Sequence, residues 1–310
     1  MLLLAGGFGL LALPALTVAL GRRLPASEWA RLCQLALACG ATVAEAALVL
    51  YALPTVLRAG GVPALAAMCQ RAVGGFLPGG SPAGWAAATA AASVAALGAY
   101  GGARARRDCR AVRAEPWLGE HQLFEDYDLV VLPTERVIAV SVAGQPDQIL
   151  ISHGLVEALA PAELDMVVRH EAAHLERGHQ RWLRLAAALD HGFAFFWPLR
   201  RSTAVLRAAL EHVADDGAAG DAPEKRRLLR SALLGVTAMS VGHDLAAFSA
   251  ADTVVARLDA LERARPHPSA ALRSLLYLPG AAIASTVLVA VAAWGGEARM
   301  LIAMAGRCPL

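Results

Sequence analysis

Two histidines and a glutamate stand at a spacing that could bind and use a metal ion. They are His170, Glu171 and His174, within the sequence HEAAH. Residues four apart lie on the same face of a helix, so His170 and His174 could direct two imidazoles at one ion. Glu171 could then take a proton from a water molecule that the ion activates. The spacing therefore predicts a hydrolytic centre with one catalytic Zn²⁺ and no other cofactor.

A catalytic zinc ion usually takes a third protein ligand and leaves a fourth position for water. The best candidate is Glu211, and Asp215 follows it one helical turn later. We expect Glu211 to bind the metal and Asp215 to hydrogen-bond a ligand imidazole from behind. His179 is an alternative third ligand, whereas His212 should point to another side of the helix. The alternative to a metal centre is a set of structural histidines and solvated carboxylates, which the intervening Glu171 argues against.

Helical and strand patterns indicate the elements that hold these residues. Pro161 suits the first turn of a helix, and apolar residues then recur at helical spacing, which predicts a helix ending near Gly178. A second helix over residues 203–219 carries the two carboxylates. Short apolar runs between turn residues suggest a small antiparallel sheet. They are residues 129–132, 137–142 and 148–152.

The segment between the two helices, residues 185–199, is rich in phenylalanine. It is too short, and too interrupted by Asp190 and Pro198, to span a bilayer. Two interpretations stay open: the segment is buried core, or it dips toward a membrane surface.

The whole chain is too apolar for an ordinary soluble protein, with 57% hydrophobic residues and a mean hydropathy of +0.48. Apolar segments predict four transmembrane helices. They are residues 1–20, 32–57, 85–100 and 275–294. The first could be a signal peptide, but no basic residue precedes its apolar run. Glu45, inside the second span, has either a role in assembly or signal coupling or a structural role.

Arginines flank three of the spans on one side, which the positive-inside rule assigns to the cytoplasm. They are Arg22, Arg23, Arg31, Arg104, Arg106, Arg107, Arg110, Arg113, Arg263, Arg265 and Arg273. Both termini then lie outside, and residues 58–84 form an external loop. The net charge of +2 implies no nucleic-acid partner, so we expect the arginines to contact the lipid bilayer. Cys69 and Cys308 would both be external and could pair.

Three spans, a cytoplasmic HEAAH segment and a fourth span together resemble the BlaR/MecR-type antirepressor metallopeptidases. The resemblance is carried by residues 149–155 (ILISHGL), by His170 to His174, and by Glu211 with Asp215. Membrane peptidases of the HtpX type and of the CAAX-prenyl-protease type share these motifs. The order of the spans favours the BlaR/MecR type.

The resemblance implies a mainly α membrane protein of four transmembrane helices with an inserted cytoplasmic α+β, zincin-like (gluzincin) metallopeptidase domain. Residues 1–102 would hold three spans, residues 103–272 the peptidase domain, and residues 273–310 the fourth span and a short external tail. In that fold the strand near residues 137–142 would run beside the cleft and could pair with an extended substrate.

The resemblance also implies a zinc endopeptidase of the bacterial cell membrane that cleaves a protein substrate, such as a winged-helix repressor, in signal transduction. The likeness to the HtpX type implies quality control of membrane proteins instead. A third alternative is a non-catalytic, zinc-binding signalling protein.

Two features depart from the BlaR/MecR pattern. Receptors of that type carry a penicillin-binding sensor domain after the last span, whereas a short tail follows Trp294 here. We therefore expect a sensor partner, the external loop or the membrane to provide any signal, and the chain could form a homodimer. Family members often have an Asp where His179 stands.

Overall fold

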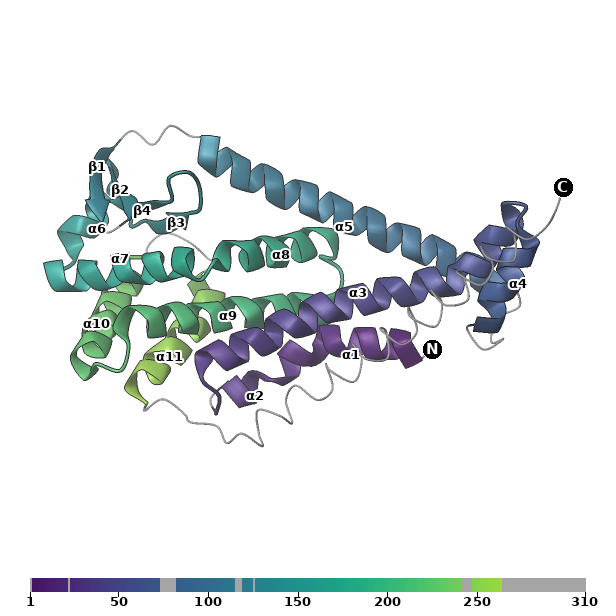
Figure 1. The fold of residues 1–310 in the computed structure, drawn as a ribbon. Helices are drawn as coiled ribbons and strands as arrows, with labels where there is room; N and C mark the ends of the chain where they lie inside the picture. Colours follow the sequence, from purple (N-terminus) through teal and green to yellow (C-terminus); the bar gives the residue numbers. More distant parts are fainter. Residues whose placement is uncertain are drawn as a thin grey trace. The chain divides into compact units, whose positions relative to one another are not determined.

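The computed structural model describes residues 2–21, 23–72, 82–114, 119–124, 126–240 and 247–263. The predicted fourth span and Cys308 lie outside these residues. The described chain is mostly helical with one small mixed sheet (Figure 1). It divides into two compact units. Of the described residues, those within Met1–Pro14 and Leu35–Ala99 form the first unit, and those within Ala15–Gln34 and Tyr100–Pro268 form the second.

The first unit is built from apolar helices whose backbones approach closely. They are α1 (Leu2–Leu16), α4 (Pro63–Ala72), and the larger parts of α3 (Ala26–Ala59) and α5 (Pro82–Ala114). A Cβ atom on Gly7 would lie 2.7 Å from the backbone nitrogen of Ala44, and one on Gly40 would lie 2.8 Å from that of Leu11. Glycine at both positions therefore allows α1 and α3 to touch, as small residues do between membrane helices.

Two helices are long and apolar enough to cross a bilayer: α3, and α5 over Pro82–Arg110. They contain the second and third predicted spans. The first predicted span forms two helices, α1 and α2 (Val18–Gly21), which are separated at Thr17. Glu45 lies on α3, and its buried Oε2 atom has no hydrogen-bond partner within the described residues.

The sheet of the second unit has four strands in the order β1-β2-β4-β3. They are β1 (Glu120–Phe124), β2 (Tyr127–Leu132), β3 (Ala139–Val142) and β4 (Gln148–Ser152). All three predicted strands are present, and β1 is an addition. The prediction of an antiparallel sheet was wrong for the central pair, because β2 and β4 run parallel. Alternating apolar residues show which face is buried, but not the direction of the neighbouring strand.

β3 lies at the edge of this sheet and pairs antiparallel with β4. The backbone N–H of Ser152 donates to the carbonyl of Ile138, so this pair is hydrogen-bonded. Pairs alternate along an antiparallel ladder, so Ala139 and Ser141 direct their backbone N–H and C=O groups away from β4. β3 therefore offers a row of backbone groups along its outer edge.

Six helices follow the start of the sheet in the second unit, which also contains α2, the start of α3 and the end of α5. The six are α6 (His153–Ala158), α7 (Pro161–Glu176), α8 (His179–Gly192), α9 (Trp197–Ala219), α10 (Pro223–Ser240) and α11 (Ala247–Glu262). In Figure 1 the sheet lies on one side of α7 while α9 and α10 lie on the other. One face of α7 packs Val168, Ala172 and Leu175 against Ile149 and Ile151 of β4. The opposite face of α7 is thus left for α9.

α7 begins where the sequence predicts, with Pro161 at its first position. The side chain of Glu163 caps the N-terminus of α7 by accepting a hydrogen bond from the backbone N–H of Ala160 (3.1 Å). The helix ends at Glu176, two residues earlier than predicted. Gly178 has φ = 61°, a left-handed conformation that favours glycine, and the chain turns there into α8.

α7 and α9 pack closely because small residues face each other between them. A Cβ atom on Gly217 would lie 2.8 Å from the Cβ of Ala173. Ala209 and Ala214 are buried along α9. This close packing brings short carboxylate side chains of α9 within reach of imidazoles on α7.

The segment over residues 185–199 is not buried core throughout. It forms the end of α8, a turn and the start of α9, which begins at Trp197 rather than at the predicted Thr203. Phe195 and Trp197 are 75% and 68% exposed. Their exposure favours the alternative in which this turn meets an apolar surface.

Candidate metal centre

α7 presents His170 and His174 one turn apart on its buried face, with 7% and 5% of their surfaces exposed. Their Nε2 atoms lie 3.3 Å apart. Two imidazole nitrogens this close need a shared proton or a cation, because two lone pairs facing each other would repel.

α9 brings Glu211 to the same point. Its Oε2 lies 3.3 Å from Nε2 of His170, and its Oε1 lies 3.5 Å from Nε2 of His174. One ligand atom from each of the three residues lies within 4.8 Å of the others, so the three could hold a metal ion. The structure thus brings together the three ligands that the sequence predicts.

The separations between these donors match the size of a zinc ion. Zinc takes imidazole nitrogen and carboxylate oxygen at about 2.0–2.2 Å, so neighbouring ligands of a tetrahedral ion lie about 3.3–3.5 Å apart. Two neutral imidazoles and one carboxylate also form a ligand set that zinc takes in peptidases. The residues present therefore fit Zn²⁺, although the same donors accept other divalent ions.

Asp215 lies one turn beyond Glu211 and reaches the other side of His170. Its Oδ1 is 3.0 Å from Nδ1 of His170, and only 2% of the residue is exposed. A carboxylate there favours an N–H at Nδ1 and leaves Nε2 with a lone pair for a metal. Asp215 thus lies at ion-pair distance from the imidazole that the sequence predicts it to support, and its hydrogen bond to that ring stays a prediction.

His179, the alternative third ligand, and His212, expected to point elsewhere, both lie outside the ligand cluster. His179 places its Nδ1 3.0 Å from Nδ1 of His174, on the side of that ring opposite to Nε2. It could orient His174 as Asp215 orients His170. His212 packs its ring 5.8 Å from that of Trp29, away from the three donors.

Burial and charge shift the pKa values of this cluster in opposite directions. Burial opposes a charge on His170, but the carboxylates of Asp215 and Glu211 outweigh it and raise the pKa of His170 to about 10. Burial would raise the pKa of Glu211, but contact with His170 and Arg257 lowers it to about 2. Burial lowers the pKa of His174, and burial together with His174 lowers that of His179 to about 4. The two carboxylates thus create a potential that favours a cation.

Sequence reasoning missed Arg257, a buried arginine on α11. Its guanidinium donates to both oxygens of Asp215 (2.8 and 2.6 Å) and lies 3.0 Å from Oε2 of Glu211. A signal was present in the sequence, because Arg257 shares a helical face with the apolar Val254 and Leu261. A charge on such a face requires a buried partner.

The three predicted ligands line an open cleft of about 540 Å³. Glu171 lies on its wall beside the ligands. The edge strand β3 forms another wall, where the side-chain amide of Gln180 donates to the outward carbonyl of Ser141 (2.8 Å). The cleft therefore combines the predicted metal ligands, the predicted proton acceptor and an edge strand whose outward carbonyl at Ser141 is bonded to Gln180.

The chain was compared with protein-family models, with curated proteins and with solved structures, and none of the three comparisons found a match.

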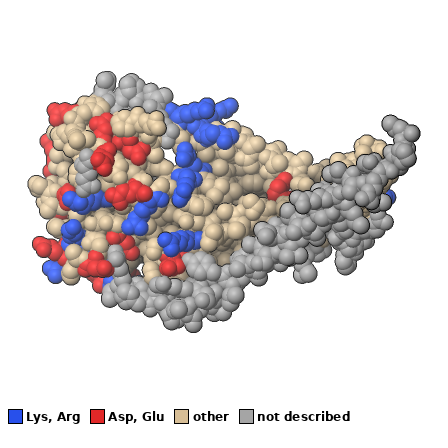
Figure 2. All heavy atoms as spheres, in the orientation of Figure 1, with Lys and Arg blue, Asp and Glu red and all other residues tan. Residues whose placement is uncertain are grey.

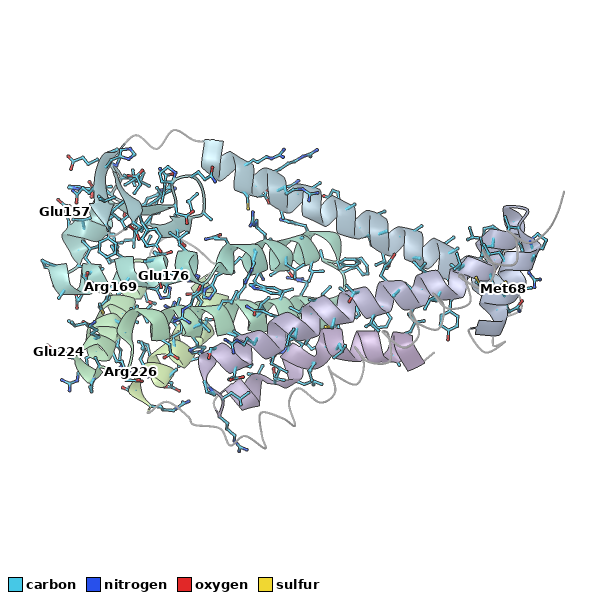
Figure 3. All side chains as sticks on the ribbon, viewed as in Figure 1. Met68, Glu157, Arg169, Glu176, Glu224 and Arg226 are labelled. Carbon is cyan, nitrogen blue, oxygen red and sulfur yellow. The ribbon has the colours of Figure 1, made fainter. Side chains whose placement is uncertain are left out.

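We expect substitution of a predicted ligand to weaken metal binding and substitution of the predicted proton acceptor to leave it unchanged. His170→Ala and Glu211→Ala each remove a donor and should weaken zinc affinity at least about 100-fold, whereas Glu171→Gln should keep one zinc ion per chain. Competition with a chromophoric chelator measures the affinity. Glu224→Ala, an exposed carboxylate on α10 (Figure 3), is the matched control. Wild-type affinity in Glu211→Ala would exclude it as a ligand.

The metal-free protein should lose stability as the pH rises from 7 to 10. The folded pKa of His170 is raised above the ordinary 6.5, so its contribution is fully present below pH 6.5 and is lost as the pH passes about 10. His174 and His179 have lowered pKa values, so their contributions stay constant above pH 6.5. Thermal melts of chelator-treated protein measure this loss. If chelator-treated His170→Gln loses thermal stability over the same pH range as the wild type, the loss does not come from His170.

Proposed function

We propose that this chain is a membrane-anchored zinc endopeptidase that cleaves a cytoplasmic protein, as its resemblance to BlaR/MecR-type peptidases implies. One observation carries the proposal: the donors of His170, His174 and Glu211 converge at zinc-like separations on a cleft whose wall holds Glu171. A purely structural zinc site needs neither an open cleft nor a proton acceptor beside it.

Zinc held by the three ligands would supply Lewis-acid chemistry, which activates water and polarises a peptide carbonyl. Glu171 accepts the proton of the attacking water and delivers it to the nitrogen of the departing amine. Asp215 keeps His170 in the orientation that leaves its Nε2 directed at the centre. The substrate backbone pairs with the outer edge of β3, next to the ligands.

In the proposal the peptidase domain faces the cytoplasm and both termini lie outside. Arginines at the start of α3 and along the end of α5 support this orientation. Figure 2 shows basic side chains gathered in a band across this face of the second unit, with acidic side chains over the sheet and α7. The two apolar helices support attachment to the bilayer, and the fourth span remains part of the proposal.

The decisive experiment compares new protein N-termini in cells that express wild-type protein or Glu171→Gln. Cleavages that require Glu171 should appear only with the wild type, because Gln cannot accept the proton. Glu176→Gln, an exposed carboxylate at the end of the same helix (Figure 3), should cleave like the wild type.

The set of cleaved proteins separates the functions. A single regulator, such as a winged-helix repressor, supports the antirepressor role, whereas many membrane proteins point to quality control. Identical N-termini in all three strains would favour the non-catalytic alternative.

Pairing of substrate with β3 predicts that Ser141→Pro lowers kcat/KM about two- to tenfold on a peptide substrate. Proline removes the outward N–H of Ser141, which is worth about 0.5–1.5 kcal/mol when bonded to substrate. Proline is tolerated on edge strands because the pairing with β4 does not use this N–H. Ser141→Ala, which keeps the N–H, is the control. Equal kcat/KM in both variants would show that substrate does not pair here.

A further inference from the structure

Arg257 contacts both carboxylates of α9 at the centre, as His170 does from the opposite helix. Its Nε and Nη2 donate to the two oxygens of Asp215, and its Nη1 lies 3.0 Å from Oε2 of Glu211. Only 9% of the residue is exposed. A rigid, forked guanidinium can bridge two carboxylates in this way, whereas the single ammonium of lysine cannot.

The helix that carries Arg257 is fixed in place by α10. The side chain of Arg226, labelled in Figure 3, donates to the carbonyls of Leu261 (2.9 Å) and Ala260 (2.6 Å) at the end of α11. Leu261 is buried with Met166 of α7 and Leu229 of α10. Arg257 therefore extends to the centre from a helix that is held in place by its contacts with α7 and α10.

We propose that Arg257 is a positioning residue that makes Glu211 bind the metal through one oxygen only. A carboxylate can bind an ion through one oxygen or through both. Here Oε2 of Glu211 lies 3.3 Å from Nε2 of His170 but is engaged by Arg257 at 3.0 Å, which leaves Oε1, the oxygen near His174, for the metal. A one-oxygen ligand keeps open the position that a reacting water needs. The inference rests on the metal site of the proposed function.

Metal affinity alone would not test this role, because two effects oppose each other. Loss of Arg257 removes a positive charge that repels a second cation, which would strengthen binding. It also releases both carboxylates from their fixed orientation, which would weaken binding. The coordination of the metal is the property that depends on the engaged oxygen.

The test uses the full-length protein in detergent with Co²⁺ in place of Zn²⁺, because the visible d–d absorption of Co²⁺ reports the number of ligands. In Arg257→Met, Glu211 should bind through both oxygens, so the absorption should weaken and shift relative to the wild type. Arg257→Lys, which keeps a positive charge in the buried space, should give an intermediate spectrum. Arg263→Met, which removes an exposed arginine just beyond α11, should leave the spectrum unchanged.

The outcomes separate the positioning role from the metal site. Wild-type spectra in both Arg257 variants would overturn the positioning role while leaving the metal site intact. Failure of the wild-type protein to bind Co²⁺ would overturn the metal site and the positioning role with it. If Arg257→Met does not fold, the spectrum of Arg257→Lys decides alone, because a purely structural role would lower its melting temperature without altering the absorption.

Discussion

The contact between Asp215 and His170 is the interaction on which the centre depends. Their atoms lie 3.0 Å apart in a space that excludes water almost completely. A buried carboxylate is costly unless it is paired, and Asp215 is paired with His170 on one side and Arg257 on the other. This double pairing keeps Asp215 ionised and so fixes which nitrogen of His170 faces the metal ligands.

Packing in the rest of the second unit brings Asp215 close enough to His170 for this contact. Short side chains such as Asp can bridge two helices only if the helices approach closely. Gly217 and Ala173 allow that approach between α7 and α9. On its other face α7 is fixed by the apolar residues of β4, so His170 and His174 cannot move away from α9. Small residues at Gly217 and Ala173 are thus required here, because larger ones would separate the two helices.

Local patterns were sufficient to predict the elements that carry the ligands. The spacing of His170 and His174, Pro161 at the start of α7, and the spacing of Glu211 and Asp215 each depend on helix geometry alone. The structure places all of these residues where the spacing requires, and their roles in catalysis stay predictions. A local pattern was also sufficient for β4, because its bounds match those of the strand predicted from the apolar run over residues 148–152.

Contacts between distant segments could not be predicted in the same way. The parallel pairing of β2 with β4 depends on how the intervening chain crosses the sheet, and the alternation of apolar residues is identical for either direction. Arg257 contacts Asp215 across 42 residues of sequence, and no local spacing encodes that separation. His179 was considered as a ligand because of its distance along the chain from His174. Its position behind that ring follows from the left-handed turn at Gly178.

The charges of the centre show why proton and metal would compete for it. Two ionised carboxylates and one guanidinium leave a net negative charge in a buried space, and the neighbouring imidazoles must balance it. In the metal-free protein a proton on His170 supplies the balance, which is why its pKa is raised although burial opposes the charge. A divalent ion would also neutralise this negative charge and would lie between the facing Nε2 atoms of His170 and His174. Binding of a metal would therefore displace a proton without exposing a buried carboxylate, so the helices could keep one arrangement in both states.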